Sequence, residues 1–309
     1  MTQIFDTNHL AQAASVLRDG GLVAFPTETV YGLGADATND AACEAIYIAK
    51  GRPNDNPFIV HVCDISSAEK IALVCPLAQK LFEQFSPGPI TIVMKKKPAI
   101  CDIATAGLNS VGVRIPAHPV AQEFLKLCGI PVAAPSANIS GLLSPTTADM
   151  VLRDLSGRID GIIVSDNIDC GLESTVVSVL DGHVKLLRSG AISLEQLEHC
   201  LDQKIEVADN VKIGEIPRSP GQKHKHYSPA VPLELVEFSD VNLFDLQKKY
   251  ANEKVGILFF ENLDDYARNL YQTMDEMGRN GCVRIIAVLP ENTGIGRAIR
   301  NRLIRASGK

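Results

Sequence analysis

The sequence predicts an α/β protein with two domains, and three observations along its 309 residues support this fold class. Short apolar runs typical of strands alternate with segments of helical periodicity up to about residue 205. The periodicity then fades between about residues 203 and 230, where prolines and a polar cluster are typical of a linker. Strand–helix alternation resumes after that, which indicates a second and smaller parallel sheet.

The elements expected in the first domain follow one another closely. A helix is predicted over residues 9–19, where two glycines end it, and a strand over residues 22–26, which a proline ends. A further helix covers residues 40–52. The other predicted strands span residues 58–62, 90–94, 111–116, 132–136, 161–165, 174–180 and 184–190, and the other predicted helices span residues 76–85, 118–129 and 193–201. So many strands among helices indicate one α/β domain with a large sheet over residues 1–205.

A linker is predicted over residues 206–230 and a second domain over residues 231–309. Three strands are expected in the second domain, over residues 234–238, 255–260 and 283–290, and helical sequence follows each of them. This alternation is typical of a small parallel-sheet domain.

The composition is that of a folded globular protein, with 46% hydrophobic and 21% charged residues. No apolar run approaches the ~18–20 residues that span a bilayer, and the N-terminus lacks the features of a secretory signal, so we expect a cytoplasmic protein without a membrane partner. The eight cysteines form no C-x-x-C pair, which predicts reduced thiols and no structural metal site. The net charge of −6 argues against a chain that binds polyanions over its whole surface, although a local basic cavity is compatible with it.

One unusual segment, residues 26–34, lies at the end of the first predicted strand. It combines hydroxyls, the carboxylate of Glu28 and glycines. Binding residues concentrate in loops at strand ends, and Gly32 and Gly34 would allow a ligand to approach the backbone closely. An ordinary turn capped by a threonine explains the same residues equally well.

A second segment places Lys50 and Arg52 two residues apart, beside glycine and proline. Together they can present two cations to one oligoanion, because arginine offers a planar fork and lysine a compact charge. Two solvated cations at a helix end are the simpler explanation for this segment alone. His61 lies in the next predicted strand, where a core histidine and a ligand-binding histidine are both compatible with the pattern.

A third segment, residues 134–141, is rich in small hydroxyl and amide side chains, and Ser144 follows it. Such residues can form a neutral wall for ribose or phosphate oxygens, with backbone amides as an anion nest. A common Asn/Ser turn is the alternative.

The sequence contains neither a P-loop nor a dinucleotide fingerprint nor a kinase catalytic loop.

Two arginines, Arg114 and Arg188, lie in apolar predicted strands. Burying an arginine without a partner is costly. The two arginines therefore indicate either an anionic ligand or a salt bridge to Glu28 or Glu173.

A set of short motifs between about residues 20 and 190 carries a resemblance to a known family. In chain order these motifs are PTETVYGLG, KGRP with NP, PGPIT, VGVRIP, APSANISG, ESTVV and LLRSG. They resemble the YrdC-like family of threonylcarbamoyl-AMP synthases. The family's pairing of K-x-R with S-x-N falls here on Lys50, Arg52, Ser136 and Asn138. Residues 219–229 and 294–306 resemble the linker and the C-terminal end of the two-domain form, so the resemblance covers nearly the whole chain.

The resemblance implies a large, twisted, mixed sheet with flanking helices around a deep positive cavity, and a smaller Rossmann-like domain. It implies an L-threonylcarbamoyladenylate synthase, a nucleotidyltransferase that makes threonylcarbamoyl-AMP and pyrophosphate from L-threonine, bicarbonate and ATP for the threonylcarbamoyladenosine modification of tRNA. Mg²⁺ is expected to arrive with ATP. The expected partners are downstream tRNA threonylcarbamoyl-transfer proteins, with weak RNA binding as a further interaction. The second domain is shorter than the family's usual form, which leaves its sheet size and its role open.

The resemblance also assigns site residues, position by position. Lys50 and Arg52 are the expected catalytic pair, and Tyr227 is expected to fold over the occupied cavity as a lid that contacts the nucleotide. The residues expected to hold L-threonine are Thr29, His61, Arg114, Ser174 and Thr175. Those expected to bind the nucleotide and its phosphates are Arg52, Asn56, Ser110, Ala134, Ser136, Asn138, Ser144 and Arg188.

Other functions fit parts of the sequence. A double-stranded-RNA-binding module would use a positive cavity for the phosphate backbone, but the net charge of −6 and the neutral Ser/Asn segment argue against it. A carbamoyl-transfer maturation factor would share this type of domain, but such proteins carry zinc-finger C-x-x-C pairs, which this sequence lacks. A purely structural protein leaves the strand arginines unexplained.

Overall fold

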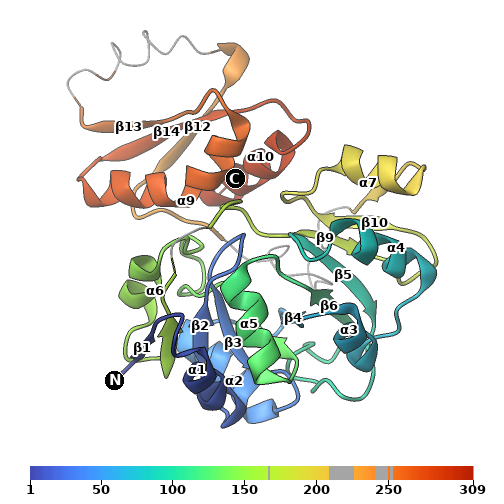
Figure 1. Ribbon diagram of the computed structural model, residues 1–309. Helices are drawn as coiled ribbons and strands as arrows, with labels where there is room; N and C mark the ends of the chain where they lie inside the picture. The colour runs from blue at the N-terminus through green and yellow to red at the C-terminus, as the bar shows by residue number, and fades with distance from the viewer. Residues whose placement is uncertain (166–167, 209–225, 241–249, 251–252, 309) are drawn as a thin grey trace.

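Eleven strands form one mixed sheet in the first part of the chain (Figure 1). The computed structural model describes residues 1–165, 168–208, 226–240, 250 and 253–308. In sheet order the strands are β1 (Gln3–Phe5), β8 (Gly161–Ile163), β2 (Val23–Phe25), β3 (Gly32–Asp36), β7 (Val132–Ala133), β4 (Ile59–His61), β6 (Ser110–Arg114), β5 (Ile90–Lys95), β9 (Thr175–Ser178), β10 (Lys185–Arg188) and β11 (Glu206–Val207). Parallel neighbours such as β4 and β6 occur beside antiparallel ones such as β5 and β6. The predicted α/β class with a large mixed sheet is confirmed.

The helices of this part of the chain flank the sheet. They are α1 (Leu10–Arg18), α2 (Asp40–Lys50), α3 (Ile65–Ile71), α4 (Pro76–Phe85), α5 (Pro119–Cys128), α6 (Ala148–Leu155) and α7 (Leu194–Leu201). Helix α2 matters most for the site, because its last residue is Lys50. Asn39 caps the start of α2 by accepting a hydrogen bond from the Ala42 amide, and Gly51 ends the helix in the left-handed conformation, with φ of 59°.

The centre of the sheet explains where polar residues gather. Strands β4 and β6 are parallel and pair in a register that sets His61 beside Arg114, each at the carboxyl end of its strand. Strand β9 begins at the same edge, because Thr175 pairs with Ile90 at the start of β5, which runs antiparallel to β6. Loops from several strands therefore meet at one edge of a rigid, buried sheet.

One predicted loop is partly a strand. Residues 32–36 form β3, between β2 and β7, although the sequence suggested a ligand-binding turn there. A Cβ atom added at Gly34 would come within 3.0–3.1 Å of side-chain atoms of Val132, Leu17 and Phe25. Gly34 is therefore needed for close packing inside the sheet, and the expectation that it lets a ligand approach the backbone is wrong.

Several short elements were not predicted: β1, β11, α3 and α6. Two- or three-residue strands are too short to show a periodicity of their own. Strand β11 also corrects the predicted start of the linker, because residues 206–207 pair in parallel with β10 and extend the large sheet.

The second part of the chain contains a small parallel sheet, as predicted. Its strands lie in the order β12 (Leu233–Glu237), β14 (Arg284–Leu289) and β13 (Val255–Leu258), and both pairs are parallel. A short 3₁₀ helix, η1 (Phe238–Asp240), follows β12. Helices α9 (Leu263–Arg279) and α10 (Gly296–Ser307) lie on the side of this sheet that faces the first domain (Figure 1).

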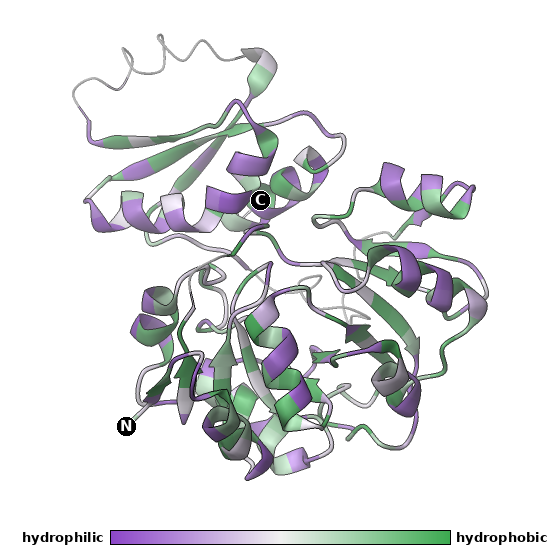
Figure 2. Cartoon of the chain, viewed as in Figure 1, coloured by the Kyte–Doolittle hydropathy of each residue, from purple (hydrophilic) through white to green (hydrophobic). Residues whose placement is uncertain are grey.

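The two parts share one buried apolar cluster. Val30 and Leu143 from the first part pack in the same cluster as Leu270 and Leu303 from α9 and α10. Figure 2 shows the strands of both sheets mainly in the green of hydrophobic residues, whereas α9 carries purple residues along its outer side. None of the helices in the described ranges is long and apolar enough to cross a bilayer.

Candidate active site

A polar cavity opens at the carboxyl ends of β4 and β6 and holds about 710 Å³ of space not filled by atoms, its mouth included. Most of the residues that the sequence assigned to a site line this one cavity. They are Thr29, Lys50, Arg52, His61, Arg114, Ala134, Ser136, Asn138, Ser144, Ser174, Arg188 and Tyr227. Segments that are up to almost 200 residues apart in sequence are thus brought together.

Three predicted residues do not line the cavity. Ser110 begins β6 opposite Lys95, and four residues of strand, roughly 13 Å, separate it from Arg114 at the cavity edge. Asn56 is buried behind Arg52 and accepts a hydrogen bond from its Nη2 through the backbone carbonyl, at 3.2 Å. The hydroxyl of Thr175 donates to the carbonyl of Ile192 at 2.6 Å, so Ser174 is the member of that pair that reaches the cavity.

Lys50, from the K-x-R motif, is hydrogen-bonded directly to the S-x-N motif. Its Nζ donates to the carbonyl of Ser136 at 2.5 Å, to the carbonyl of Asn138 at 2.6 Å and to Asn138 Oδ1 at 3.4 Å. The side chain is 1% exposed, so the explanation as a solvated helix end is wrong for this lysine. Burial lowers the pKa of Lys50 well below its usual value; the charge of Arg52 acts in the same direction and Asp154 in the opposite one. Lys50 therefore braces the loop that follows β7.

Arg52 presents its guanidinium to the cavity. Nη2 contacts the carbonyls of Asn56 and Pro57 at 3.2 and 3.4 Å, and the group lies over the ring of Phe58, 5.6 Å from its centre. Its Nε is buried and has no hydrogen-bond partner among the described residues. Burial lowers the pKa of Arg52 to about 10, so the group is still charged at neutral pH. An anion placed in the cavity would satisfy the remaining donor.

The loop that Lys50 braces forms the neutral wall that the sequence indicated. Ser136 Oγ donates to Asn138 Oδ1 at 2.6 Å, and Asn138 Nδ2 donates to the carbonyls of Ile139 and Leu142 at 2.9 and 3.0 Å. The Asn138 amide is thus fixed in one orientation, and the Ser136 hydroxyl is held against it. The wall is therefore pre-organised by its own hydrogen bonds and is more than an ordinary Asn/Ser turn.

A second set of polar groups lies around Arg114. Its Nη2 is 2.9 Å from Glu28 Oε1 and 3.5 Å from the hydroxyl of Thr27. The contact with Glu28 is one of charge rather than of aligned hydrogen bonding, because both carboxylate oxygens of Glu28 and Nε of Arg114 have no hydrogen-bond partner among the described residues. The salt bridge that the sequence offered as an alternative therefore exists, but it is incomplete.

His61 adjoins this incomplete pair. Its ring packs edge-on against Phe25 at 5.9 Å, and its Nδ1 has no partner within the described part of the chain. Burial, with the charge of Arg114 next to it, lowers the pKa of His61 to about 3, so the imidazole is neutral at pH 7. It is a core histidine on one side and a cavity residue on the other.

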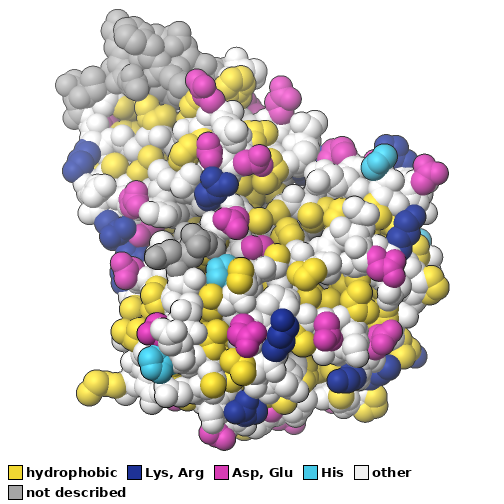
Figure 3. Space-filling model, in the orientation of Figure 1, with side chains coloured by type: hydrophobic (Ala, Val, Ile, Leu, Met, Phe, Trp, Pro, Cys, Tyr) yellow, Lys and Arg dark blue, Asp and Glu magenta, His cyan; other side chains and the backbone are white. Residues whose placement is uncertain are grey.

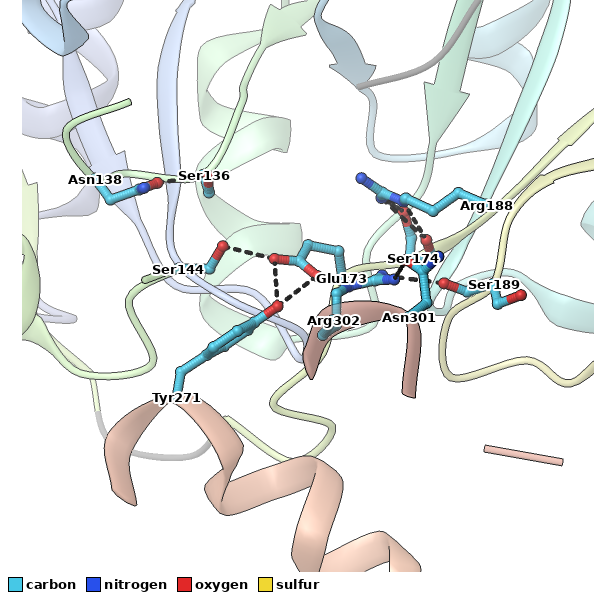
Figure 4. A network of polar contacts seen from close by, with 10 residues as sticks. All are labelled: Ser136, Asn138, Ser144, Glu173, Ser174, Arg188, Ser189, Tyr271, Asn301 and Arg302. Carbon is cyan, nitrogen blue, oxygen red and sulfur yellow. Dashed lines mark hydrogen bonds and ion pairs between the residues drawn. The ribbon is translucent and has the colours of Figure 1, made fainter. Parts of the chain in front are cut away.

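In a third set of polar groups, centred on Glu173, both carboxylate oxygens accept hydrogen bonds (Figure 4). Its carboxylate accepts from Ser144 Oγ at 2.6 Å, from the Tyr271 hydroxyl at 3.0 and 3.1 Å and from Arg302 Nε at 2.7 Å. Burial alone would raise the pKa of Glu173, but the charges of Arg302 and Arg188 outweigh it and lower the pKa to about 2. Tyr271 and Arg302 come from α9 and α10, so the second domain reaches the wall of the cavity.

Arg188 lies beside this set and donates hydrogen bonds to Ser174, the residue just before β9. Its Nε and Nη2 donate to the carbonyl of Ser174 at 3.1 and 3.0 Å, and Nη2 also reaches Ser174 Oγ at 3.1 Å. Burial lowers the pKa of Arg188, and the nearby Arg302 acts in the same direction.

Tyr227 closes one side of the cavity. Its ring stacks on Tyr271 with centroids 5.5 Å apart, and the Arg302 guanidinium lies 5.4 Å from the ring centre. The next residue, Ser228, donates its amide to the carbonyl of Gly141 at 2.9 Å. His226, which sequence reasoning did not assign, also lines the cavity. The rest of the predicted lid motif, residues 219–225, lies outside the described residues.

The chain is similar to known proteins over its whole length. Residues 15–190 match the model of the Sua5–YciO–YrdC family, described as "Telomere recombination", and residues 192–308 match the model described as "Threonylcarbamoyl-AMP synthase, C-terminal domain". The threonylcarbamoyl-AMP synthase of Bacillus subtilis is 41% identical, with 100% of this chain and 96% of that protein covered. The enzyme of the same name from Pyrococcus abyssi is 39% identical, with 96% and 93% covered.

A solved structure is also similar over the whole length. The crystal structure of Pyrococcus abyssi Sua5 complexed with L-threonine has a TM-score of 0.93 and 36% identity, with 100% of this chain and 98% of that chain covered. The similarity thus includes both sheets. The chain belongs to the threonylcarbamoyl-AMP synthase family, in its two-domain form.

Proposed function

We propose that this protein is an L-threonylcarbamoyladenylate synthase, a nucleotidyltransferase that converts L-threonine, bicarbonate and ATP into threonylcarbamoyl-AMP and pyrophosphate. One observation carries the proposal: Lys50 joins the K-x-R and S-x-N motifs by direct hydrogen bonds at the wall of a cavity that also contains Arg114. A cavity lined by arginines and hydroxyls has the chemistry to bind the carboxylate of an amino acid and the phosphates of a nucleotide. The product would serve the threonylcarbamoyladenosine modification of tRNA through downstream transfer proteins, in the cytoplasm.

L-Threonine is assigned to the end of the cavity with the incomplete ion pair. The unused donor of Arg114 would hold the α-carboxylate, and Glu28 would lie near the amine. Thr29 and Ser174 offer hydroxyls for the substrate's own hydroxyl, and neutral His61 offers Nδ1. Valine should be rejected, because it would leave these buried polar groups without partners.

The nucleotide is assigned to the other end. Arg52 and Arg188 would neutralise the phosphates, while Ser136 and Asn138 would bind phosphate or ribose oxygens. Lys50 acts by holding this wall in place. The other nucleotide contacts are assigned to Ala134, Ser144 and Tyr227.

Mg²⁺ is proposed to enter with ATP, where it would neutralise charge on the phosphates. Its ligands would be phosphate oxygens and water.

The chemistry has two steps. The amine of threonine adds to CO₂ derived from bicarbonate and gives N-carboxy-threonine. An oxygen of the new carboxylate then forms a bond to the α-phosphorus of ATP, and the bond to the bridging oxygen breaks as pyrophosphate leaves. Both reactants are anions, so catalysis rests on positioning and on charge neutralisation by Arg52 and its neighbours. Tyr227 would shield the water-sensitive product.

The test is pyrophosphate release from purified protein given ATP, Mg²⁺, bicarbonate and L-threonine. We expect release only when all four are present, and L-valine should not replace L-threonine. Release that does not depend on threonine, or none at all, would contradict the proposal. The same preparation should bind RNA only weakly and in a salt-dependent manner. In keeping with this, Lys and Arg alternate with Asp and Glu on the described residues of the face in Figure 3, rather than gathering in one basic patch.

A further inference from the structure

The C-terminal motif around Arg302 is not explained by the chemistry above. Arg302 lies in α10, is 0% exposed, and uses all three nitrogens of its guanidinium. Nε donates to Glu173 Oε2 at 2.7 Å, Nη2 to the carbonyl of Ser189 at 3.0 Å and Nη1 to Asn301 Oδ1 at 3.0 Å. Arg302 itself does not line the cavity, whereas Glu173 does. Figure 4 shows Glu173 lying between Ser144 and Arg302.

The place of Glu173 is unusual for a carboxylate. It sits in the wall of a cavity proposed for a triphosphate, next to Ser144 and Arg188. A carboxylate there would repel phosphate and would also compete with it for Arg188, because charges interact strongly where water is excluded. Tyr271 supplies hydrogen bonds to Glu173 but no charge. Only Arg302 adds a full positive charge in direct contact with this carboxylate, among the described residues.

We propose that Arg302 of the second domain is a positioning residue of the nucleotide site: it neutralises Glu173 and so makes the cavity able to accept ATP. The second domain is then a part of the active site rather than an appended module. Arg302 also contacts Tyr227, the proposed lid residue, because its guanidinium lies against the Tyr227 ring. This inference rests on the proposed function, because it requires a polyphosphate in the cavity.

A purely structural role for Arg302 makes different predictions. If the pair only joined the two domains, loss of either partner would harm the protein in the same way. If Arg302 neutralises Glu173, the two losses act in opposite directions on ATP binding. Arg302→Met leaves a negative charge in the wall, whereas Glu173→Gln leaves a positive one.

The experiment measures KM for ATP and for L-threonine by pyrophosphate release. Arg302→Met is expected to raise KM for ATP at least tenfold and KM for threonine by less than threefold. Glu173→Gln should leave KM for ATP unchanged or lower it, and the double variant should return KM for ATP to within about threefold of wild type. Arg302→Lys, which keeps the charge, should lie close to wild type. Arg300→Met on the same helix is the matched control, since Arg300 pairs with Glu237 away from the cavity.

The pH profile gives a second readout. The groups that face Glu173 are Arg302, Arg188, Tyr271, Tyr227, His226 and Ser144. Without Arg302, burial is expected to raise the pKa of Glu173, so the carboxylate should take up a proton as the pH falls. KM for ATP in Arg302→Met should then improve between pH 8 and pH 5.5, relative to wild type, while the double variant shows no such gain.

The outcomes separate the two proposals. Wild-type protein without threonine-dependent pyrophosphate release would overturn the proposed function itself. Active wild-type protein, together with Arg302→Met that keeps its KM for ATP, would overturn only the role of Arg302. So would a double variant as impaired as Arg302→Met. If Arg302→Met does not fold, Glu173→Gln and the double variant still decide, because a raised KM for ATP in both contradicts charge neutralisation.

Discussion

The molecule contains two buried glutamate–arginine pairs, and they differ in how fully their polar atoms are hydrogen-bonded. Glu173 and Arg302 are joined by an aligned hydrogen bond, and Ser144 and Tyr271 supply further donors to the carboxylate. Glu28 and Arg114 touch as charges only, and three of their polar atoms have no hydrogen-bond partner among the described residues. A saturated pair is expected to hold a structure, whereas an unsaturated one in a cavity wall is available to a ligand.

The largest effect should come from breaking the unsaturated pair. Arg114→Met should reduce kcat/KM for L-threonine by roughly 10²–10³-fold, because a desolvated, charge-assisted contact to a carboxylate is lost, at a cost of about 3–4 kcal/mol. Steady-state pyrophosphate release at varied threonine measures it. Arg158→Met, an exposed position, is the control. A change of less than about threefold would show that Arg114 does not hold the substrate.

For stability we expect the reverse order: breaking the saturated pair should lower the free energy of unfolding more than breaking the unsaturated pair. Glu173→Gln removes the negative charge and one of the two acceptor oxygens that three side chains share, and it leaves Arg302 buried without a counter-charge, so it should lower the free energy of unfolding by about 3–5 kcal/mol. Glu28→Gln loses only a charge contact beside a polar cavity and should cost about 1–2 kcal/mol. Urea unfolding of both variants measures the difference. Equal losses would remove the distinction drawn between the pairs.

Acid should weaken the fold through His61 and Glu173. The folded-state pKa of His61 is about 3 against an ordinary value of 6.5, so below pH 6.5 the unfolded chain binds a proton that the folded chain does not. Stability should therefore fall with pH by about 1.4 kcal/mol per unit between pH 6 and pH 3 from this residue. The contribution of Glu173, whose folded pKa is about 2, is present above pH 4.5 and is lost below it.

Urea unfolding at pH 7, 6 and 5 tests the histidine contribution. The free energy of unfolding of His61→Gln should decline less steeply with falling pH than that of wild type, by about 1.4 kcal/mol per pH unit, the slope for one bound proton. His226, with a pKa lowered to about 3 by burial and by Arg52, should still contribute in that variant. Parallel curves for wild type and His61→Gln would mean that His61 is not kept neutral by the fold.

The smallest contrast concerns two neighbouring hydroxyls. Ser174 faces the cavity and Thr175 donates to Ile192, so Ser174→Ala should raise KM for threonine several-fold with little loss of stability. Thr175→Val should leave that KM unchanged and lower the free energy of unfolding by about 1 kcal/mol. Kinetics and unfolding of the two variants measure both effects. A raised KM in Thr175→Val would reverse the assignment.

The sequence predicted the longer elements and most of the cavity, because helical and strand periodicity and the motif order are local properties. It misplaced residues whose position depends on pairing between distant strands. Ser110 and Arg114 belong to one short motif, but the register of β6 carries them to opposite ends of a strand. Lys50 and Arg52 are two residues apart, yet only Arg52 presents an unused donor, because Lys50 is held by the loop after β7.

The role of Arg302 was beyond prediction for the same reason. It reaches Glu173 across 129 residues of sequence and across two domains, and no local pattern connects them. The sequence did offer both residues as parts of separate motifs, ESTVV and the C-terminal helix. The packing of α9 and α10 against the first domain, which brings Arg302 to Glu173, could not be predicted from these motifs.

The shared apolar cluster also limits how substrates enter. Moving the two domains apart would expose Leu143, Leu270 and Leu303 to water and separate Glu173 from Arg302, so such an opening is expensive. Tyr227 itself packs in the same cluster, with its ring against Tyr271 and the Arg302 guanidinium, and the backbone next to it is joined to the first domain by the bridge between Leu142 and Ser228. Substrates and products should therefore enter and leave the cavity while the two domains stay docked.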